Sequence, residues 1–158
     1  MLQGIRALSH ARPAAGLSAG TIAIFANTTA LSIADLMPLA TAHGGLLRLL
    51  SQMSGIVAPS GRAFQTGFHI VVGLGMALLY AVVLEPLLTG PAWLKGVQYA
   101  FAMWMVNAVI VLPLADEGFA GSRHLSFAGM IWFAAAHTLF FVLLAILFQR
   151  FRPPGDIC

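Results

Sequence analysis

Four long apolar stretches alternate with short polar connections along this chain of 158 residues, and they cover about residues 17–40, 64–88, 94–114 and 126–148. Each stretch reaches the roughly 20 helical residues that are needed to cross a hydrocarbon core of about 30 Å. The first is longer than the roughly 7–15 residues of a signal-peptide core, so it is predicted to be a retained helix. The pattern therefore predicts an all-α polytopic membrane protein, in which residues 1–158 form one domain of four transmembrane helices.

The longest connection has a helical pattern of its own. Apolar residues recur at helical spacing over about residues 45–57, and Arg48 lies on the opposite side. Two interpretations are open. The segment is either an amphipathic helix that lies in the membrane interface or a short helix packed over the rim of the bundle.

Composition agrees with a lipid environment. Charged residues make up 8% of the chain and the mean hydropathy is +0.90, whereas about 25% of the residues in a typical soluble domain are charged. The net charge is +3, but the basic residues are scattered over tails and loops and form no stripe that follows a phosphate backbone. The lipid bilayer and other membrane proteins are therefore the predicted partners, and nucleic acid is excluded.

Motifs of catalysis are absent from the sequence. There is no glycine-rich phosphate loop, no His-Glu-x-x-His pair and no nucleophile elbow. The tails and loops are also too short for a soluble domain, which rarely falls below about 50 residues. We therefore predict that the protein is not an enzyme and that it acts through the bundle, its lipid face or its two rims.

The distribution of basic residues predicts the orientation, because short cytoplasmic segments carry an excess of Lys and Arg. The basic residues on the side of the termini are Arg6, Arg12, Lys95, Arg150 and Arg152, and those on the other side are Arg48, Arg62 and Arg123. Both termini are therefore predicted to be cytoplasmic, in a bacterial inner membrane. Glu85 is expected to pair with Lys95 across the short turn between the second and third spans.

The two halves of the chain share a pattern. Pro38-Leu39-Ala40 closes the first span and Pro113-Leu114-Ala115 closes the third, and each is followed by a loop and by a span with one histidine. This pattern is typical of two related helical hairpins in parallel orientation, although so short a triplet also recurs by chance. In either case the proline is expected to end its helix at the outer rim.

Small residues line one face of the second span. Gly73, Ala77 and Ala81 follow His69 at successive steps of four, and this spacing lets another helix backbone approach closely. The first span, another copy of the chain and a foreign subunit are all candidate partners of this face. A second candidate contact surface is the aromatic face of the fourth span, with Trp132, Phe133, Phe140, Phe141 and Phe148.

The first span carries a polar stripe at helical spacing, which contains Ser18, Thr21, Thr28, Ser32 and Asp35 and is interrupted by Phe25. Polar groups inside the hydrocarbon usually face protein or water. The stripe is interpreted as interhelical hydrogen bonding, worth about 0.6–2 kcal/mol per bond, or alternatively as a path for a substrate or proton. Asp35 is also expected close enough to His69 to form a carboxylate–imidazole pair.

The two intramembrane histidines raise the question of a cofactor. A bis-histidine haem would need His69 and His137 at one depth, but helical rise counted from the span ends separates them by about 10 Å. This difference argues against the pair, whereas one histidine alone remains able to ligate a haem or chlorin. A neutral buried histidine bonded to a Thr, to an Asn such as Asn107 or to a backbone carbonyl is the simpler interpretation, so no cofactor and no metal site are predicted.

Three segments resemble the small, uncharacterised four-helix bacterial membrane proteins of unknown function. They are Gly20-Thr21-Ile22-Ala23, the step from His69 through Gly73 to Tyr80, and Trp93-Leu94-Lys95-Gly96. The resemblance covers about two-thirds of the chain, and the fourth span departs from it at Phe141, where a glycine would be expected. It implies the fold and the topology and no activity.

The leading functional hypothesis is a non-catalytic integral membrane subunit, an accessory component of a larger complex, such as an energy-transducing one, or of a homo-oligomer. The first alternative is a small transporter or channel that uses the polar stripe. The second is a haem-, chlorin- or metal-binding membrane subunit that uses His137 or His69.

Overall fold

Four helices of this protein are long and apolar enough to cross a membrane in the part of the chain that the structure describes. A computed structural model describes the backbone of residues 2–37, 39 and 45–153, and the side chains of residues 12–34, 36, 37, 39 and 45–153. The candidate spans are Arg12–Ala34, Arg62–Leu87, Ala92–Leu114 and Phe127–Phe151. The predicted all-α, four-span fold is therefore confirmed.

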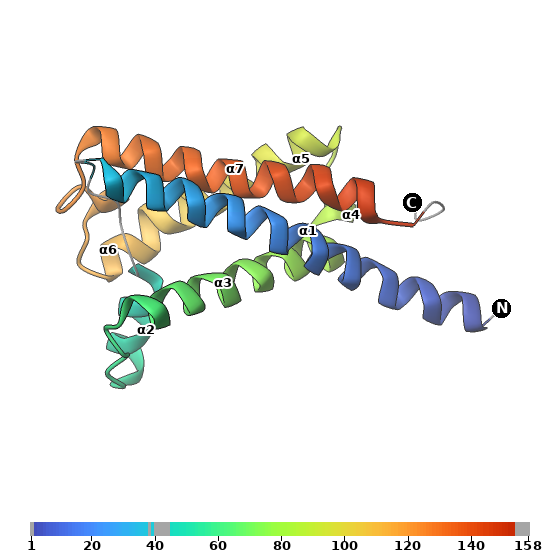
Figure 1. Ribbon diagram of the computed structural model, residues 1–158, viewed down its shortest axis with the longest axis horizontal. Coiled ribbons are helices and arrows are strands. Elements are labelled where there is room, and N and C mark those ends of the chain that lie inside the picture. Colours follow the sequence, from blue (N-terminus) through green and yellow to red (C-terminus); the bar gives the residue numbers. More distant parts are fainter. Residues whose placement is uncertain (1, 38, 40–44, 154–158) are drawn as a thin grey trace.

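The helices follow one another up and down (Figure 1). The first span is α1 (Leu2–Leu36), and α2 (Gly45–Ser54) lies in the long connection. The second span consists of α3 (Arg62–Leu79), the π-helical η1 (Tyr80–Leu84) and α4 (Glu85–Leu87). The third consists of α5 (Ala92–Val106), the π-helical η2 (Asn107–Val111) and α6 (Leu112–Leu114). The short η3 (Phe119–Gly121) leads into the fourth span, α7 (Phe127–Phe151). We call the end with both termini the terminal end and the opposite one the loop end.

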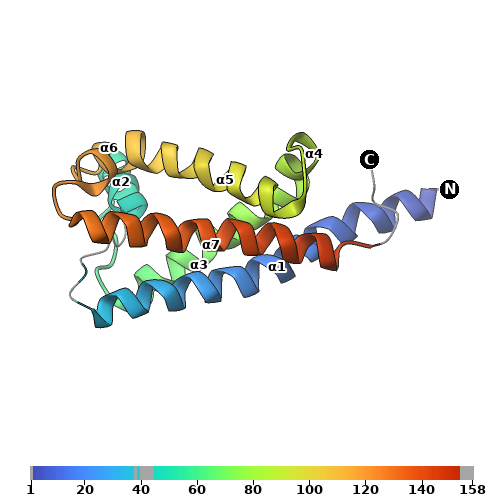
Figure 2. The same cartoon turned by 90° about the horizontal axis from the view of Figure 1, so that it is seen from above.

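The helices pack tightly in the terminal half of the bundle and diverge in the loop half. α7 lies along both α1 and α5, and α1 also packs on α3, whereas α3 runs along neither α5 nor α7 (Figures 1 and 2). The buried aromatic residues gather in the terminal half. The ring of Tyr80 stacks on Tyr99 at 5.9 Å and meets Phe148 edge-on at 5.7 Å, and Tyr99 contacts Phe141 at 4.3 Å. The loop half lacks an equivalent contact between α3 and α5, and it is there that the bundle is hollow.

The small-residue face of the second span packs on α1. A Cβ atom added to Gly20 would lie 2.4 Å from the Cβ of Ala77, and one added to Gly16 would lie 2.6 Å from the Cβ of Ala81. Gly73 is equally close to the side chain of Ile24. Of the candidate partners of this face, the first span of the same chain is therefore the one that contacts it in the structure. The aromatic face of α7 also points inward, since Phe140, Phe141 and Phe148 are buried and Trp132 and Phe133 are partly buried.

Each π-helical turn ends two residues before a proline. The N–H of Glu85 donates to the carbonyl of Tyr80, and the N–H of Leu112 donates to that of Asn107, both five residues back. Within a regular α-helix the next residue, Pro86 or Pro113, would lack a donor and clash with the carbonyl four residues earlier. The wider turn accommodates this ring. Pro113 therefore lies inside the last turn of the third span, which ends at Leu114 as the sequence predicted.

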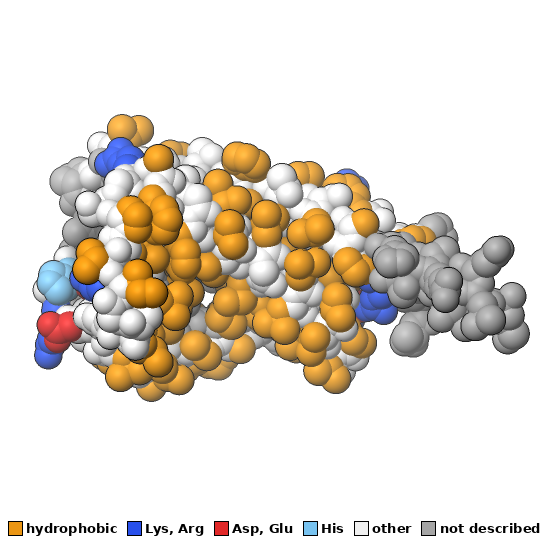
Figure 3. Space-filling view, turned by 90° about the horizontal axis from the view of Figure 1, so that it is seen from below, with side chains coloured by type: hydrophobic (Ala, Val, Ile, Leu, Met, Phe, Trp, Pro, Cys, Tyr) orange, Lys and Arg blue, Asp and Glu red, His pale blue; other side chains and the backbone are white. Residues whose placement is uncertain are grey.

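Hydrophobic side chains are spread along the face seen in Figure 3, and the charged side chains visible there gather at its two ends. At the loop end the carboxylate of Glu117 forms an ion pair with Arg48 of α2 and lies 2.7 Å from Nδ1 of His124. Beyond this attachment no other described element covers α2, and the side chain of Met53 is 76% exposed. The first turns of α2 therefore lie at the rim of the bundle, and the placement of its apolar end in a membrane interface stays a prediction.

Candidate functional site

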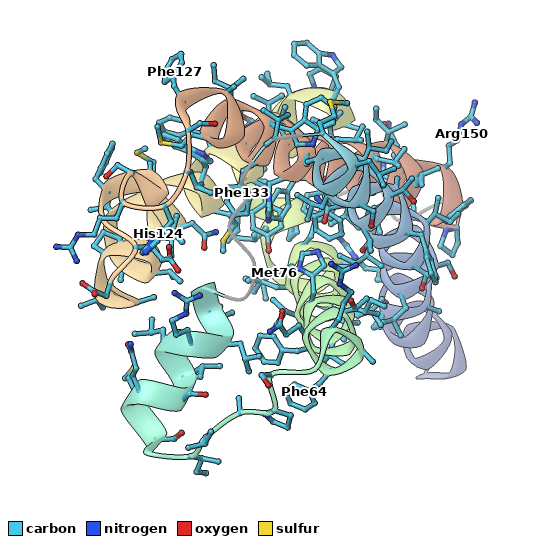
Figure 4. All side chains as sticks on the ribbon, turned by 60° about the vertical axis from the view of Figure 1, so that its left-hand side comes forward. Phe64, Met76, His124, Phe127, Phe133 and Arg150 are labelled. Atoms are coloured by element: carbon cyan, nitrogen blue, oxygen red, sulfur yellow. The ribbon has the colours of Figure 1, made fainter. Side chains whose placement is uncertain are left out.

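A cavity of about 700 Å³ occupies the loop half of the bundle, between α1, α3, α5 and α7 and beside the first turn of α2. Its wall is mainly apolar. Met76 and Phe133 point into the middle of the bundle, whereas Phe64, Phe127 and Arg150 point away from it (Figure 4). The polar residues of the wall include Asn27, Thr28, Ser32, His69, Asn107 and His137. A mostly apolar cavity with a few convergent polar groups is typical of a small-molecule site.

Asn27 links three helices on one side of the cavity. Its Nδ2 donates to the carbonyl of Ala136 in α7 at 2.8 Å, and its Oδ1 lies 2.8 Å from Nε2 of His69 in α3. The carbonyl of Ala136 can only accept, so the amide orientation is determined, and Nε2 of His69 must be the donor. The side chain of Asn27 is 1% exposed. Asn27 thus makes the clearest interhelical hydrogen bonds of the first span, although it is not one of the stripe residues predicted from the sequence.

His137 has the opposite tautomer from the one imposed on His69. Its Nδ1 lies 2.8 Å from the carbonyl of Phe133, one turn earlier in α7, and therefore carries the proton. The ring of Phe133 lies against the imidazole, with centroids 4.1 Å apart. Nε2 is left as the nitrogen with the lone pair, and it makes no hydrogen bond with any residue whose side chain the structure describes. An imidazole whose N–H is held by a carbonyl is oriented as metal-ligating histidines usually are.

The two histidines lie together at one level of the bundle. Their ring centroids are 6.3 Å apart and their planes are nearly perpendicular. The predicted depth difference of about 10 Å is therefore wrong. It assumed helices perpendicular to the membrane, whereas α3 leaves the bundle at an angle (Figure 1) and the second span contains the π-helical turn η1.

Metal–nitrogen bonds of about 2 Å place two imidazoles on one metal ion with centroids about 6 Å apart. The observed separation is therefore compatible with a shared metal, but Nε2 of His69 is engaged by Asn27. The hydrogen bonds favour His137 as a single ligand. The described residues contain no group of three or more candidate metal ligands, so a site built from several protein ligands is not evident there.

The other polar residues near the cavity differ in their hydrogen bonding. Thr28 has a buried hydroxyl without a hydrogen-bond partner among the described residues. Asn107 donates to the carbonyl of Met103 in its own helix at 3.1 Å, and the structure does not pair it with His137. Trp132 of α7 donates from Nε1 to the carbonyl of Ala30 in α1 at 2.9 Å and so supports the back of the cavity.

The N-terminal part of the polar stripe faces away from the bundle. Ser18 and Thr21 are exposed, and Phe25 between them and Thr28 is 60% exposed. Thr21 donates to the carbonyl of Leu17, four residues earlier, which satisfies its hydroxyl within α1. Only Thr28 and Ser32 line the cavity. The side chain of Asp35 and its expected pairing with His69 lie outside the described residues.

Arg62 and Gln65 line the mouth of the cavity at the loop end. Arg62 begins α3 and precedes His69 by seven residues, which is two helical turns or about 10 Å along the helix. The guanidinium forms no ion pair with any described side chain. In the sequence Arg62 was notable only as one of the basic residues that predicted the orientation. Its seven-residue spacing from His69 was the available signal that the two residues share a helix face.

No protein-family model matches the chain, and comparison with curated proteins and with solved structures found no match. The resemblance to small four-helix bacterial membrane proteins stays a prediction. The functional argument therefore rests on the geometry of the cavity.

Proposed function

We propose that this protein is a non-catalytic integral membrane subunit that holds a tetrapyrrole of the haem or chlorin type in the cavity, with His137 as its single axial ligand. The observation that carries the proposal is the Nε2 of His137. This nitrogen belongs to a ring that lines a 700 Å³ cavity, its proton is on Nδ1 because of the Phe133 carbonyl, and it has no described protein partner. Histidine through one ring nitrogen is a common axial ligand of haem iron.

The remaining wall suits the rest of such a molecule. The macrocycle is planar and apolar, and Met76, Trp104 and Phe133 supply apolar and aromatic surface around His137. Arg62 lies about 10 Å toward the loop end, where it would pair with the carboxylates at the edge of a haem. Such a pairing would compensate a guanidinium that no described carboxylate neutralises.

Visible absorption of the purified protein tests this function. The full-length chain would be produced with haem biosynthesis intact, extracted in a mild detergent, and titrated with haemin and with zinc protoporphyrin. We expect a Soret band that co-purifies or is restored by titration with about one equivalent of ligand. His137→Ala should abolish the shift of that band, and Arg62→Gln should weaken binding while leaving the position of the band unchanged.

His124→Ala is the matched control, because His124 is exposed at the loop end and pairs with Glu117 outside the cavity. It should bind as the unmodified protein does. Failure of the unmodified protein to shift the spectrum of either tetrapyrrole would refute the proposal. Retention of the full shift in a folded His137→Ala variant would refute the assignment of the ligand.

Assembly with a second copy or with another subunit is a second proposal, and the exposed part of the polar stripe favours it. Hydroxyl-bearing faces on membrane helices commonly lie at helix–helix interfaces, and Ser18, Thr21 and Phe25 are exposed on the described surface of α1. Cysteine crosslinking in a Cys158→Ser background tests this. Phe25→Cys should crosslink in native membranes, whereas Phe101→Cys, on the equally exposed surface of α5, should not. Equal behaviour of the two would count against this interface.

A further inference from the structure

A single carboxylate at the terminal end of the bundle holds three cations, and each comes from a different span. Glu85 of α4 pairs through Oε2 with Nη2 of Arg12 at 2.6 Å. Its Oε1 pairs with Nζ of Lys95 at 3.0 Å and with Nη1 of Arg152 at 3.2 Å. We call these four residues the Glu85 cluster. The sequence predicted only the pair with Lys95.

The π-helical turn shapes part of this cluster. Because Glu85 donates to Tyr80 and residue 86 is a proline, the carbonyl of Ala81 lacks its usual helical donor. Nε of Arg12 reaches this carbonyl at 3.4 Å. Lys95 in turn bonds the carbonyl of Glu85 at 2.9 Å. The cations are therefore held in position by backbone as well as by the carboxylate.

The described charges of the cluster do not balance, because three cations surround one carboxylate. The side chains are only 21%, 17% and 22% exposed for Arg12, Lys95 and Arg152, and 12% for Glu85. Partly buried charge without a counter-charge is costly. A guanidinium has five N–H donors, and the contacts of Arg152 use one of them. The cluster thus combines surplus positive charge with unused donors.

The charge balance at the loop end differs from that of the Glu85 cluster. Its described carboxylates are each paired with one arginine, Glu117 with Arg48 and Asp116 with Arg123. The terminal end therefore has the larger excess of positive charge among the described residues. Arg150, exposed in the last turn of α7, adds to it.

We infer that the Glu85 cluster binds the phosphate of an anionic phospholipid. The cluster lies where the spans end, which is the headgroup level of a bilayer. Leu87 and Trp93 beside it are 70% and 55% exposed and present apolar surface to acyl chains. Basic pockets between membrane helices at this level are typical binding sites for anionic headgroups. A free phosphate ion shares the headgroup's charge but would gain nothing from the apolar surroundings.

Thermal unfolding of the full chain in detergent tests the inference. Phosphatidylglycerol, phosphatidylcholine and inorganic phosphate would each be titrated into the purified protein. We expect phosphatidylglycerol to raise the unfolding midpoint in a saturable manner and the other two to have no comparable effect. Arg152→Gln should weaken the apparent affinity about fivefold, because one basic residue near the surface contributes about 1 kcal/mol.

Arg150→Gln is a second variant that breaks no contact with Glu85, so it probes the charge without endangering the fold. It should weaken phosphatidylglycerol binding in the same direction. Arg123→Gln, at the loop end, is the matched control and should leave the titration unchanged. Equal effects of phosphatidylglycerol and phosphatidylcholine, or equal titrations of the Arg150, Arg152 and Arg123 variants, would overturn the inference. Inorganic phosphate that reproduces the full shift would replace the lipid by a free anion and would overturn it as well.

Discussion

Asn27 and His69 join the first and second spans through a hydrogen bond of 2.8 Å, and the same amide donates to the carbonyl of Ala136 in the fourth. Three helices of the loop half thus depend on one buried side chain. This half lacks the aromatic packing of the terminal half, so the polar contact has few apolar contacts to replace it.

Replacement of Asn27 by alanine should therefore destabilise the bundle. We expect the free energy of unfolding to fall by about 1–2 kcal/mol. The variant loses two interhelical hydrogen bonds, and the groups of His69 and Ala136 that Asn27 had bonded stay buried. Unfolding in mixed micelles with increasing denaturing detergent measures the change. Asn107→Ala is the matched control, because its amide bonds only a carbonyl of its own helix, and it should change stability by less than about 0.5 kcal/mol. Equal losses of stability in the two variants would show that the hydrogen bonds of Asn27 do not hold the three helices together.

Gly96 should not tolerate even a methyl group. A Cβ atom at this position would lie 2.6 Å from Cα of Val142 and 2.8 Å from the carbonyl oxygen of Phe141. These are backbone atoms of α7, so relief requires the two helices to separate. We expect Gly96→Ala to reduce stability by about 1–3 kcal/mol, the usual range for overpacking.

Gly75 provides the control for this change, because a Cβ atom there would meet nothing within 4 Å. Gly75→Ala should be neutral or stabilising, since alanine favours a helix over glycine by up to about 1 kcal/mol. Thermal unfolding followed by circular dichroism compares the two variants. A Gly96 variant as stable as the Gly75 variant would show that α5 and α7 are not in this close contact.

Glu117 is expected to hold α2 at the loop end. Its carboxylate is 6% exposed and pairs with both Arg48 and His124, so Glu117→Gln removes the charge that binds α2 to the loop. Hydrogen exchange within Gly45–Ser54 should become several times faster. Asp116→Asn changes the neighbouring carboxylate, whose side chain is 81% exposed and pairs with Arg123 alone. It should leave exchange in α2 unchanged, because exposed pairs contribute little.

The four spans were predictable from the sequence because length and apolar composition suffice to define a bilayer-crossing helix. Their ends were less predictable. Charged Arg12 was assigned to the tail, but it lies within helix α1 and pairs there with Glu85 of the second span. That pairing joins residues 73 positions apart, and no local pattern reveals it.

The cavity was not predictable, because it results from the angle between helices. The small face of α3 and the glycines of α1 determine where these two spans meet, and that contact leaves α3 apart from α5 in the loop half. His69 and His137 consequently come to one level, against the depth counted from helical rise. Sequence identified both histidines as notable residues and could not place them together.

The predicted orientation has a direct test in the single cysteine of the chain, Cys158. If the termini are cytoplasmic, as the excess of basic residues at the terminal end predicts, a membrane-impermeant maleimide should label Cys158 only after the cells are permeabilised. In a Cys158→Ser background, Ser122→Cys places the thiol at an exposed position of the loop end, and this variant should be labelled in intact cells. Labelling in the reverse order would invert the topology. The Glu85 cluster would then lie at the outer leaflet, and its lipid would have to be sought there.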